Sequence, residues 1–205
     1  MITTLYSFAP QDRSGKVRWL LKELEVDFDV KTLNGEENEH KQSHYTSVSP
    51  MGLVPAIIYE GQTIYESGAI AIFLTERVTS KRVLAPAVNS PHRAEFLKWV
   101  IFSTATLDPL LIKVFNTKGM SVAEKKNHRS QIYLEFKTTA SVLEMILADG
   151  SFVVGNEFSA ADIMLAQPLD WADKGGLLVN HPLLKAYLDN LKLRQACIDS
   201  AIFQS

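Results

Sequence analysis

The chain has 205 residues, of which 46% are hydrophobic, and a formal net charge of −2 at pH 7. This length and apolar content suffice for one large domain or two small ones, and they exclude wholesale disorder. The charge is close to neutral and no basic stripe is present, so we expect neither nucleic acid nor an anionic membrane as a partner. The histidine spacings match no common zinc motif, and we expect no metal site.

The N-terminal residues have the pattern of a short strand, without the charged start and apolar stretch of a signal peptide. No apolar run approaches the ~20 residues needed to cross a bilayer. The single cysteine, Cys197, cannot form an internal disulfide, as a reducing compartment predicts. We therefore expect a cytoplasmic protein in which Cys197 is a small buried side chain rather than a nucleophile.

The first part of the chain alternates between strand and helix patterns. A strand over 2–8 is followed by a helix over 14–25, whose apolar residues recur at i, i+3, i+4 and i+7. An alternating strand over 27–33 comes next and completes a βαβ unit, whose crossover should be right-handed. The polar segment 34–48 is expected to be a loop that can contain one irregular helix.

Two further strands and a helix complete this part. The strands 54–59 and 63–65 flank a Glu-Gly turn at 60–61, which is typical of a hairpin. A helix over 67–78 follows. The order βαβ-ββα predicts an α/β domain of thioredoxin-like fold over 1–80, with four strands in one mixed sheet covered by helices.

Beyond this domain, only helical patterns are found. Turn-forming residues over 81–90 indicate a linker. A Ser-x-x-Glu capping box at 121–124 opens a long helix, and a Ser-x-x-Asp box at 159–162 precedes another. We assign these boxes to folding rather than to catalysis. The sequence therefore predicts an all-α helical domain over 91–205.

Two dipeptides suggest a binding site for a peptide-like ligand. If the bond from Val54 to Pro55 is cis, the backbone of Val54 turns outward and can pair with an extended peptide. Glu66 and Ser67 stand at a helix start, which favours a ligand carboxylate, while the Glu66 carboxylate can hold an ammonium group. The alternatives are an edge-strand proline without a ligand and an ordinary helix cap.

The loop over 8–15 is a second place where chemistry can occur. It offers Arg13 as a cation, Ser7 and Ser14 as hydroxyls, and a helix N-terminus, all of which favour a thiolate over a thiol. The alternative is that Ser14 or Asp12 merely caps the helix. No Cys-x-x-Cys motif is present, so the chain is not a dithiol redox protein.

Taken together, these motifs resemble the soluble glutathione transferase family. The run Ser49-Pro-x-Gly-Leu-Val-Pro55, then Glu66-Ser67-Gly-Ala-Ile70, then the box at 159–162 match the family in order and spacing. The resemblance covers essentially the whole chain. The segment around the first helix looks most like bacterial members with theta-like N-terminal motifs.

The resemblance assigns roles to the matching positions. It implies that Val54 pairs with the cysteinyl backbone of glutathione and that Pro55 follows a cis bond. It implies that Glu66 and Ser67 bind the γ-glutamyl group, and that His40 lies near the glycyl carboxylate. Glutathione is thus the expected co-substrate, and no metal is implied.

One position departs from the family pattern. Where theta-like members have a catalytic serine, this chain has Gln11. We therefore expect Ser14 to donate the hydrogen bond that stabilises the thiolate, with Arg13 as electrostatic support. Ser7, Gln11 or a backbone N–H remain the alternatives for activating the thiol.

The resemblance implies a homodimeric, cytoplasmic glutathione transferase that takes part in detoxification. The thiolate of glutathione would attack a small electrophilic substrate held against an apolar wall, for which Phe8, Phe102 and Phe115 are the candidates. Ordinary core packing is the alternative for each of the three. A glutathione-dependent peroxidase or disulfide reductase is the alternative enzyme. A glutathione-binding module without catalysis is the alternative from another class, which Gln11 keeps open.

Overall fold

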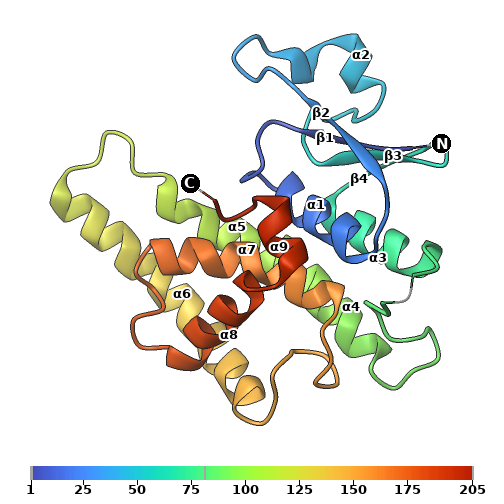
Figure 1. The fold of residues 1–205 in the computed structure, drawn as a ribbon. Helices are drawn as coiled ribbons and strands as arrows, with labels where there is room; N and C mark the ends of the chain where they lie inside the picture. Colours follow the sequence, from blue (N-terminus) through green and yellow to red (C-terminus); the bar gives the residue numbers. More distant parts are fainter. Residues whose placement is uncertain (1, 81, 205) are drawn as a thin grey trace. The chain divides into compact units, whose positions relative to one another are not determined.

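The computed structural model describes residues 2–80 and 82–204 (Figure 1). The chain divides into two compact units. The first comprises Met1–Ala85 together with Leu193–Ser205, and the second comprises Pro86–Lys192. Each unit is described by itself below.

The first unit is built on a four-stranded mixed sheet with the strand order β2-β1-β3-β4. Strands β1 and β2 pair in parallel, whereas β3 pairs antiparallel with both β1 and β4. This is the thioredoxin-like arrangement that the βαβ-ββα order predicts. The elements are β1 (Thr3–Ser7), α1 (Ser14–Glu23), β2 (Phe28–Thr32), the short helices η1 (Glu39–Lys41) and α2 (Ser43–Thr46), β3 (Ala56–Tyr59), β4 (Gln62–Tyr65), α3 (Ser67–Arg77) and α9 (Gln195–Ser200).

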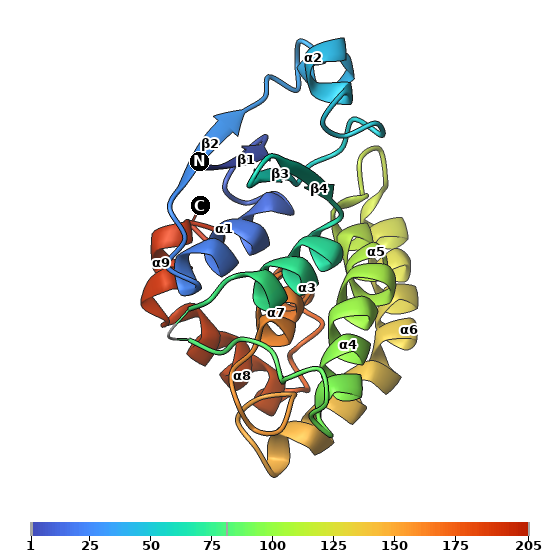
Figure 2. The same cartoon turned by 90° about the vertical axis from the view of Figure 1, so that its right-hand side faces the viewer.

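Both faces of this sheet are covered. Helices α1 and α3 lie side by side against one face (Figures 1 and 2). On the other face, Tyr6 of β1 and Tyr45 of α2 belong to a buried apolar cluster, and their ring centroids are 5.2 Å apart. Successive side chains of β1 point to opposite faces, so neighbouring Leu5 and Tyr6 contribute to different layers of the core.

Two turn features fix how β3 lies in the sheet. At the β3–β4 turn, Glu60 and Gly61 both have positive φ angles, 49° and 81°, as a type I′ hairpin requires. Strand β3 begins at Ala56, two residues later than the strand expected from the sequence. Pro55 has no N–H to donate to a ladder, which explains the shorter strand.

The C-terminal segment belongs to the first unit because its residues pack on α1. The buried carboxylate of Glu23 accepts hydrogen bonds from Nε and Nη2 of Arg194 at 2.7 and 3.0 Å. It also accepts hydrogen bonds from the side chains of Trp19 and Arg82. The helical domain expected over 91–205 thus differs from the structural division, in which the second unit ends at Lys192. The segment carries Cys197, which is buried as expected.

The second unit is all-helical. Nearly every residue of α7 is buried, so this helix forms its centre. Capping boxes at Ser121 and Ser159 start α6 and α7, which confirms both Ser-x-x-acid predictions. The elements are α4 (Arg93–Phe102), the π-helical turn η2 (Ser103–Leu107), α5 (Asp108–Leu111), the 3-10 turn η3 (Ile112–Phe115), α6 (Val122–Ala148), α7 (Ala160–Lys174) and α8 (Pro182–Lys192).

Candidate functional site

A cavity of about 170 Å³ lies within the first unit, at the end of the sheet where α1 and α3 begin. Three segments contribute its walls: the loop before α1, the loop that leads into β3, and the junction of β4 with α3. The structure thus brings together five residues that the sequence singled out from distant positions. The lining residues are Arg13, Ser49, Met51, Leu53, Val54, Pro55, Tyr65, Glu66 and Ser67.

The loop over 49–55 presents the backbone of Val54. The bond from Val54 to Pro55 is cis, which confirms the expectation from the sequence. Neither the N–H nor the C=O of Val54 makes a hydrogen bond with any residue that the structure describes. Both groups are therefore available to an extended ligand that adds to this edge in the manner of a strand.

Hydrogen bonds from the other side of the loop hold it in place. The carbonyl of Leu53 accepts from the hydroxyl of Tyr45 at 2.6 Å and from Oγ of Ser49 at 2.9 Å. Burial raises the pKa of Tyr45 to about 12, so its hydroxyl stays a donor at neutral pH. At Gly52, where φ is +61°, a Cβ would lie 2.4 Å from the carbonyl oxygen of His40, so the loop requires glycine here.

The start of α3 is open to an anion. Glu66 is the N-cap residue, with φ 71° and ψ 115°, and within the described residues its side chain makes no capping hydrogen bond. The first intrahelical bond is donated by Ile70 to the carbonyl of Glu66, which leaves the preceding N–H groups of Ser67 and Gly68 without an intrahelical partner. Ser67 is therefore the first helical residue rather than the cap. A positive φ at a glutamate costs energy and is often found at ligand sites.

The loop before α1 is organised by the carboxylate of Asp12. Its Oδ2 accepts from the backbone N–H of Phe8 at 2.7 Å and of Ala9 at 3.1 Å, while Oδ1 accepts from the N–H of Ser14 at 2.6 Å. Asp12 therefore caps the first residue of α1, which was one of the alternatives expected from the sequence. This arrangement leaves Arg13, the N-cap residue of α1, as the residue of this loop that lines the cavity.

The hydroxyl of Ser14 is directed inward. It is fully buried and donates to Oγ of Ser7 at 2.6 Å, and Ser7 in turn donates to the carbonyl of Ala9 at 3.0 Å. Gln11 is exposed, and its Nε2 donates to the carbonyl of Gln204 at 2.7 Å. None of these three candidate activating residues is among those that line the cavity.

His40 lies behind the loop over 49–55 rather than in the cavity wall. Its ring meets that of Phe8 edge-on, with the centroids 5.2 Å apart, and its buried Nδ1 has no hydrogen-bond partner within the described residues. Next to it, Nζ of Lys41 donates to the carbonyl of Met51 at 3.1 Å. His40 and Lys41 therefore adjoin the site through this loop.

The three phenylalanines proposed as an apolar wall belong to different units. Phe8 packs on the cluster around Tyr6 in the first unit. In the second unit, Phe102 meets Trp99 edge-on, whereas Phe115 is half exposed beside Trp171. Their shared role against one substrate stays a prediction.

Sequence reasoning missed four lining residues, namely Ser49, Met51, Leu53 and Tyr65. The first three lie inside the 49–55 motif that identified Val54, so they could have been predicted from the sequence. Tyr65 precedes Glu66 and is the last residue of β4. Only the register of the hairpin places it at the cavity. Within residues 2–80 and 82–204, no group of three potential metal ligands gathers, and no helix has the length and apolarity to span a membrane.

Comparisons with known proteins agree with this fold. The family model "Glutathione S-transferase, N-terminal domain" matches residues 1–76, and "Glutathione S-transferase, C-terminal domain" matches residues 126–190. Together they cover more than half of the chain, which belongs to the glutathione S-transferase family.

Individual relatives share about a quarter of their residues with this chain. Glutathione S-transferase 1 of Schizosaccharomyces pombe is 27% identical over 168 residues, covering 78% of this chain and 71% of its own. The disulfide-bond oxidoreductase YfcG of Escherichia coli strain K12 is 25% identical, and the match covers 92% of this chain and 90% of YfcG. The structure of a glutathione transferase family member from Pseudomonas fluorescens pf-5, solved with two glutathione molecules bound, superposes with a TM-score of 0.83 at 24% identity, covering 97% and 92%.

Proposed function

We propose that this chain binds glutathione in the cavity of the first unit and activates its thiol for transfer to a small electrophile. The observation that carries this proposal is the placement of Glu66 and the uncapped start of α3 in one cavity wall. An α-amino acid group carries a carboxylate and an ammonium on one carbon. The N–H groups of Ser67 and Gly68 suit the carboxylate, and the Glu66 carboxylate suits the ammonium.

The remaining groups of the tripeptide fit the other walls. The unpaired N–H and C=O of Val54 suit the backbone of the cysteinyl residue, as in strand addition. On this orientation the glycyl carboxylate extends toward the side of the 49–55 loop where His40 and Lys41 lie. The length of glutathione thereby accounts for residues both inside the cavity and beside it.

Thiol activation falls to Arg13 in this proposal. A free thiol has a pKa of ~8.5, so only a few per cent is ionised at neutral pH. A guanidinium that contacts the sulfur favours the thiolate, and the N-terminus of α1 adds to the same effect. Ser14 acts indirectly, because its hydroxyl holds the loop that carries Arg13.

The reaction then needs no further catalytic group on this chain. The sulfur lone pair forms a bond to an electrophilic carbon, the leaving group departs with the electron pair of its bond, and the thiol proton passes to solvent. The family's dimeric state, the cytoplasmic location and the contribution of Phe8, Phe102 and Phe115 to the electrophile's binding belong to the same proposal.

Disulfide or peroxide reduction is the second candidate. Its support is the likeness to the disulfide-bond oxidoreductase of Escherichia coli, which spans nearly all of both chains. The same thiolate would then attack sulfur or oxygen instead of carbon. Steady-state assays with glutathione against an aryl halide, a peroxide and a mixed disulfide separate the two activities. Glutathione binding without turnover of any of them would identify a binding module.

A further inference from the structure

Strand β2 forms one border of the sheet, and its outer edge has no partner strand among the described residues (Figure 2). Four of its five residues are exposed, and only Phe28 is partly covered. A strand at the edge of a sheet presents N–H and C=O groups that another chain can pair with. The hydrogen-bonding groups on this side of β2 therefore lie open to a second chain.

The ladder between β1 and β2 shows which groups of β2 face outward. Ser7 is paired with Thr32, and its carbonyl accepts from the N–H of Leu33 at 2.8 Å. In a parallel ladder a strand bonds to one neighbour through every second residue, so the odd-numbered residues of β2 bond to β1. The N–H and C=O groups of Phe28, Val30 and Thr32 consequently face away from the sheet.

The side chains of β2 alternate between the two faces of the sheet. Phe28 and Val30 lie on the face that α1 covers, where both line a hollow beside this helix. Asp29 and Lys31 lie on the opposite face, and Nζ of Lys31 is 5.5 Å from the ring centroid of Tyr6. Neither Asp29 nor Lys31 forms a salt bridge with a described residue. The edge thus carries one negative and one positive side chain, two residues apart on one face.

This pattern is complementary to itself in one antiparallel register. With Val30 opposite Val30 of a second copy, the outward groups of both residues meet as a hydrogen-bonded pair, and Phe28 meets Thr32 in the same way. Asp29 then lies opposite Lys31 of the second copy, on both sides of the two-fold axis. Opposite charges, and an aromatic facing a β-branched residue, are favourable cross-strand pairs.

Neighbouring registers lack this complementarity. A shift of one residue sets outward-facing backbone groups against residues whose groups face β1, so the ladder cannot form. A shift of two sets Asp29 opposite Asp29 in one direction and Lys31 opposite Lys31 in the other, and like charges directly opposite are destabilising. Charged side chains on an edge usually oppose pairing with another chain, but here they select one register. The other edge strand, β4, has no charged side chain to make such a selection.

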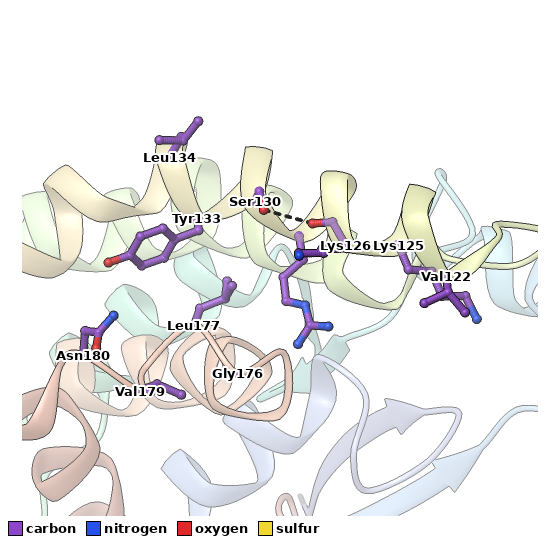
Figure 3. Close-up of a pocket in the computed structure, with 11 residues that line it drawn as sticks. Val122, Lys125, Lys126, Ser130, Tyr133, Leu134, Gly176, Leu177, Val179 and Asn180 are labelled. Atoms are coloured by element: carbon purple, nitrogen blue, oxygen red, sulfur yellow. Dashed lines mark hydrogen bonds between the residues drawn. The ribbon is translucent and has the colours of Figure 1, made fainter.

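The exposed hollow in the helical unit is of a different kind. It has a volume of about 700 Å³ and lies between α6 and the turn after α7 (Figure 3). Helical backbone groups bond within the helix, and on this wall the hydroxyl of Ser130 also donates back to the carbonyl of Lys126 at 3.0 Å. In the turn, the N–H groups of Gly176 and Leu177 donate to carbonyls of α7. These walls present side chains, whereas β2 presents backbone groups.

We propose that two copies of this chain associate through β2, antiparallel about a two-fold axis at Val30, so that their two sheets become one. The contact covers Val30, which is 40% exposed, and satisfies the outward groups of the strand. It uses residues of the first unit alone and does not depend on the glutathione cavity or on the proposed transferase reaction. Where the chain is already a dimer through other surfaces, this contact joins two dimers.

Charge reversal across the axis tests the proposal on the full chain, by sedimentation velocity over a concentration series. Asp29→Lys sets two lysines opposite each other and Lys31→Asp sets two aspartates, so each should weaken the association about tenfold. The combined variant exchanges the two charges and should return to within about twofold of the wild type. It lacks the contact of Lys31 with Tyr6, as Lys31→Asp does, so its recovery cannot come from packing within one copy.

The matched control is Asp27→Lys, which makes the same change of charge just outside the paired strand. Asp27 is exposed and precedes β2, and in the proposed register it lies opposite Leu33. The association should be unchanged in this variant.

Disulfide trapping locates the axis. Val30→Cys brings two cysteines to a Cα separation of about 5.5 Å, within the range of a disulfide, so a mild oxidant should link the copies. Thr32→Cys, on the same face of the strand, separates the two by about 13 Å along the strands and should link far more slowly. The natural cysteine, Cys197, is buried.

Four outcomes would overturn the proposal. They are single charge variants that associate as the wild type does, a combined variant that does not recover, an Asp27→Lys variant weakened as much as Asp29→Lys, and a Thr32→Cys variant that links as fast as Val30→Cys.

Discussion

The hydroxyl of Ser14 donates a 2.6 Å hydrogen bond to Oγ of Ser7, and both side chains are fully buried in the first unit. A hydroxyl committed in this way cannot also meet a ligand in the cavity that Arg13 lines. The pair, together with Asp12, instead fixes the backbone that precedes α1. In the proposed function, stabilisation of the thiolate is therefore assigned to Arg13 and not to Ser14, the residue expected from the sequence.

The first prediction concerns the pKa of the thiol of bound glutathione. Arg13→Gln should raise it by about 1–2 units, because a charge-assisted contact to the thiolate is lost. Titration of the thiolate absorbance of the complex measures this shift. Gln11→Ala is the control and should leave the pKa unchanged, since its amide is directed to Gln204. A shift of a unit or more in Ser14→Ala, with none in Arg13→Gln, would restore Ser14 as the donor to the sulfur.

The second prediction concerns glutathione affinity. Glu66→Gln keeps the shape of the side chain but removes the charge that pairs with the γ-glutamyl ammonium. The affinity should fall by about 1.5–3 kcal/mol, the range for a hydrogen bond to a charged group. Calorimetry on Glu66→Gln and on Glu37→Gln, an exposed glutamate outside the cavity, separates this effect from the change in net charge. Equal affinities in the two variants would remove the proposed orientation of the ligand.

Much of the fold was accessible from the sequence because its signals are local. Alternating and helical periodicities depend on neighbouring residues, and the boxes at Ser121 and Ser159 are complete within four positions. Val54 and Pro55 were identified for a similar reason, since the motif that contains them is complete within residues 49–55. Local patterns thus predicted the order of elements and residues in each of the three segments that line the cavity.

The remaining features depend on contacts between distant residues. The pairing of Glu23 with Arg194 joins positions 171 residues apart, and no local pattern indicates that the C-terminal segment packs on α1. The side chain of Ser14 likewise points inward because its hydroxyl bonds to Ser7, the last residue of β1. A serine at a helix start is a good candidate for exposure, and only the packed structure shows that its hydroxyl is satisfied inside.

The third prediction concerns the stability of the helical unit. Asp162 is fully buried, and its carboxylate accepts from the N–H groups of Ser159 and Val153 and from the hydroxyl of Tyr187. Asp162→Ala leaves these donors unpaired and should cost about 1–3 kcal/mol, or several degrees of melting temperature. Asp149→Ala, at an exposed helix end, should have little effect. Glutathione affinity should be unchanged in both; if only affinity or turnover falls in Asp162→Ala, the residue is not structural.

The fourth prediction is a pH dependence of stability set by Glu23. Burial alone would raise the pKa of this carboxyl, but hydrogen bonds from Arg194 and Trp19 and the charge of Arg194 outweigh burial and lower it. A carboxyl whose pKa is lower in the folded state stabilises that state fully above its ordinary pKa of 4.5. The contribution is lost as the pH falls below 4.5 through the lowered value, because the unfolded chain then binds the proton first.

The variant Glu23→Gln should therefore be less stable than the wild type at neutral pH, by about 1–3 kcal/mol. The difference should shrink as the pH is lowered through this range, since the wild type loses the ionised carboxylate and the variant has none to lose. Melting temperatures of the two proteins between neutral and acidic pH measure the effect. Glu25→Gln removes a nearby exposed carboxylate and should follow the wild-type curve. A difference that stays constant with pH would mean that Glu23 stabilises the unit by packing alone, without its charge.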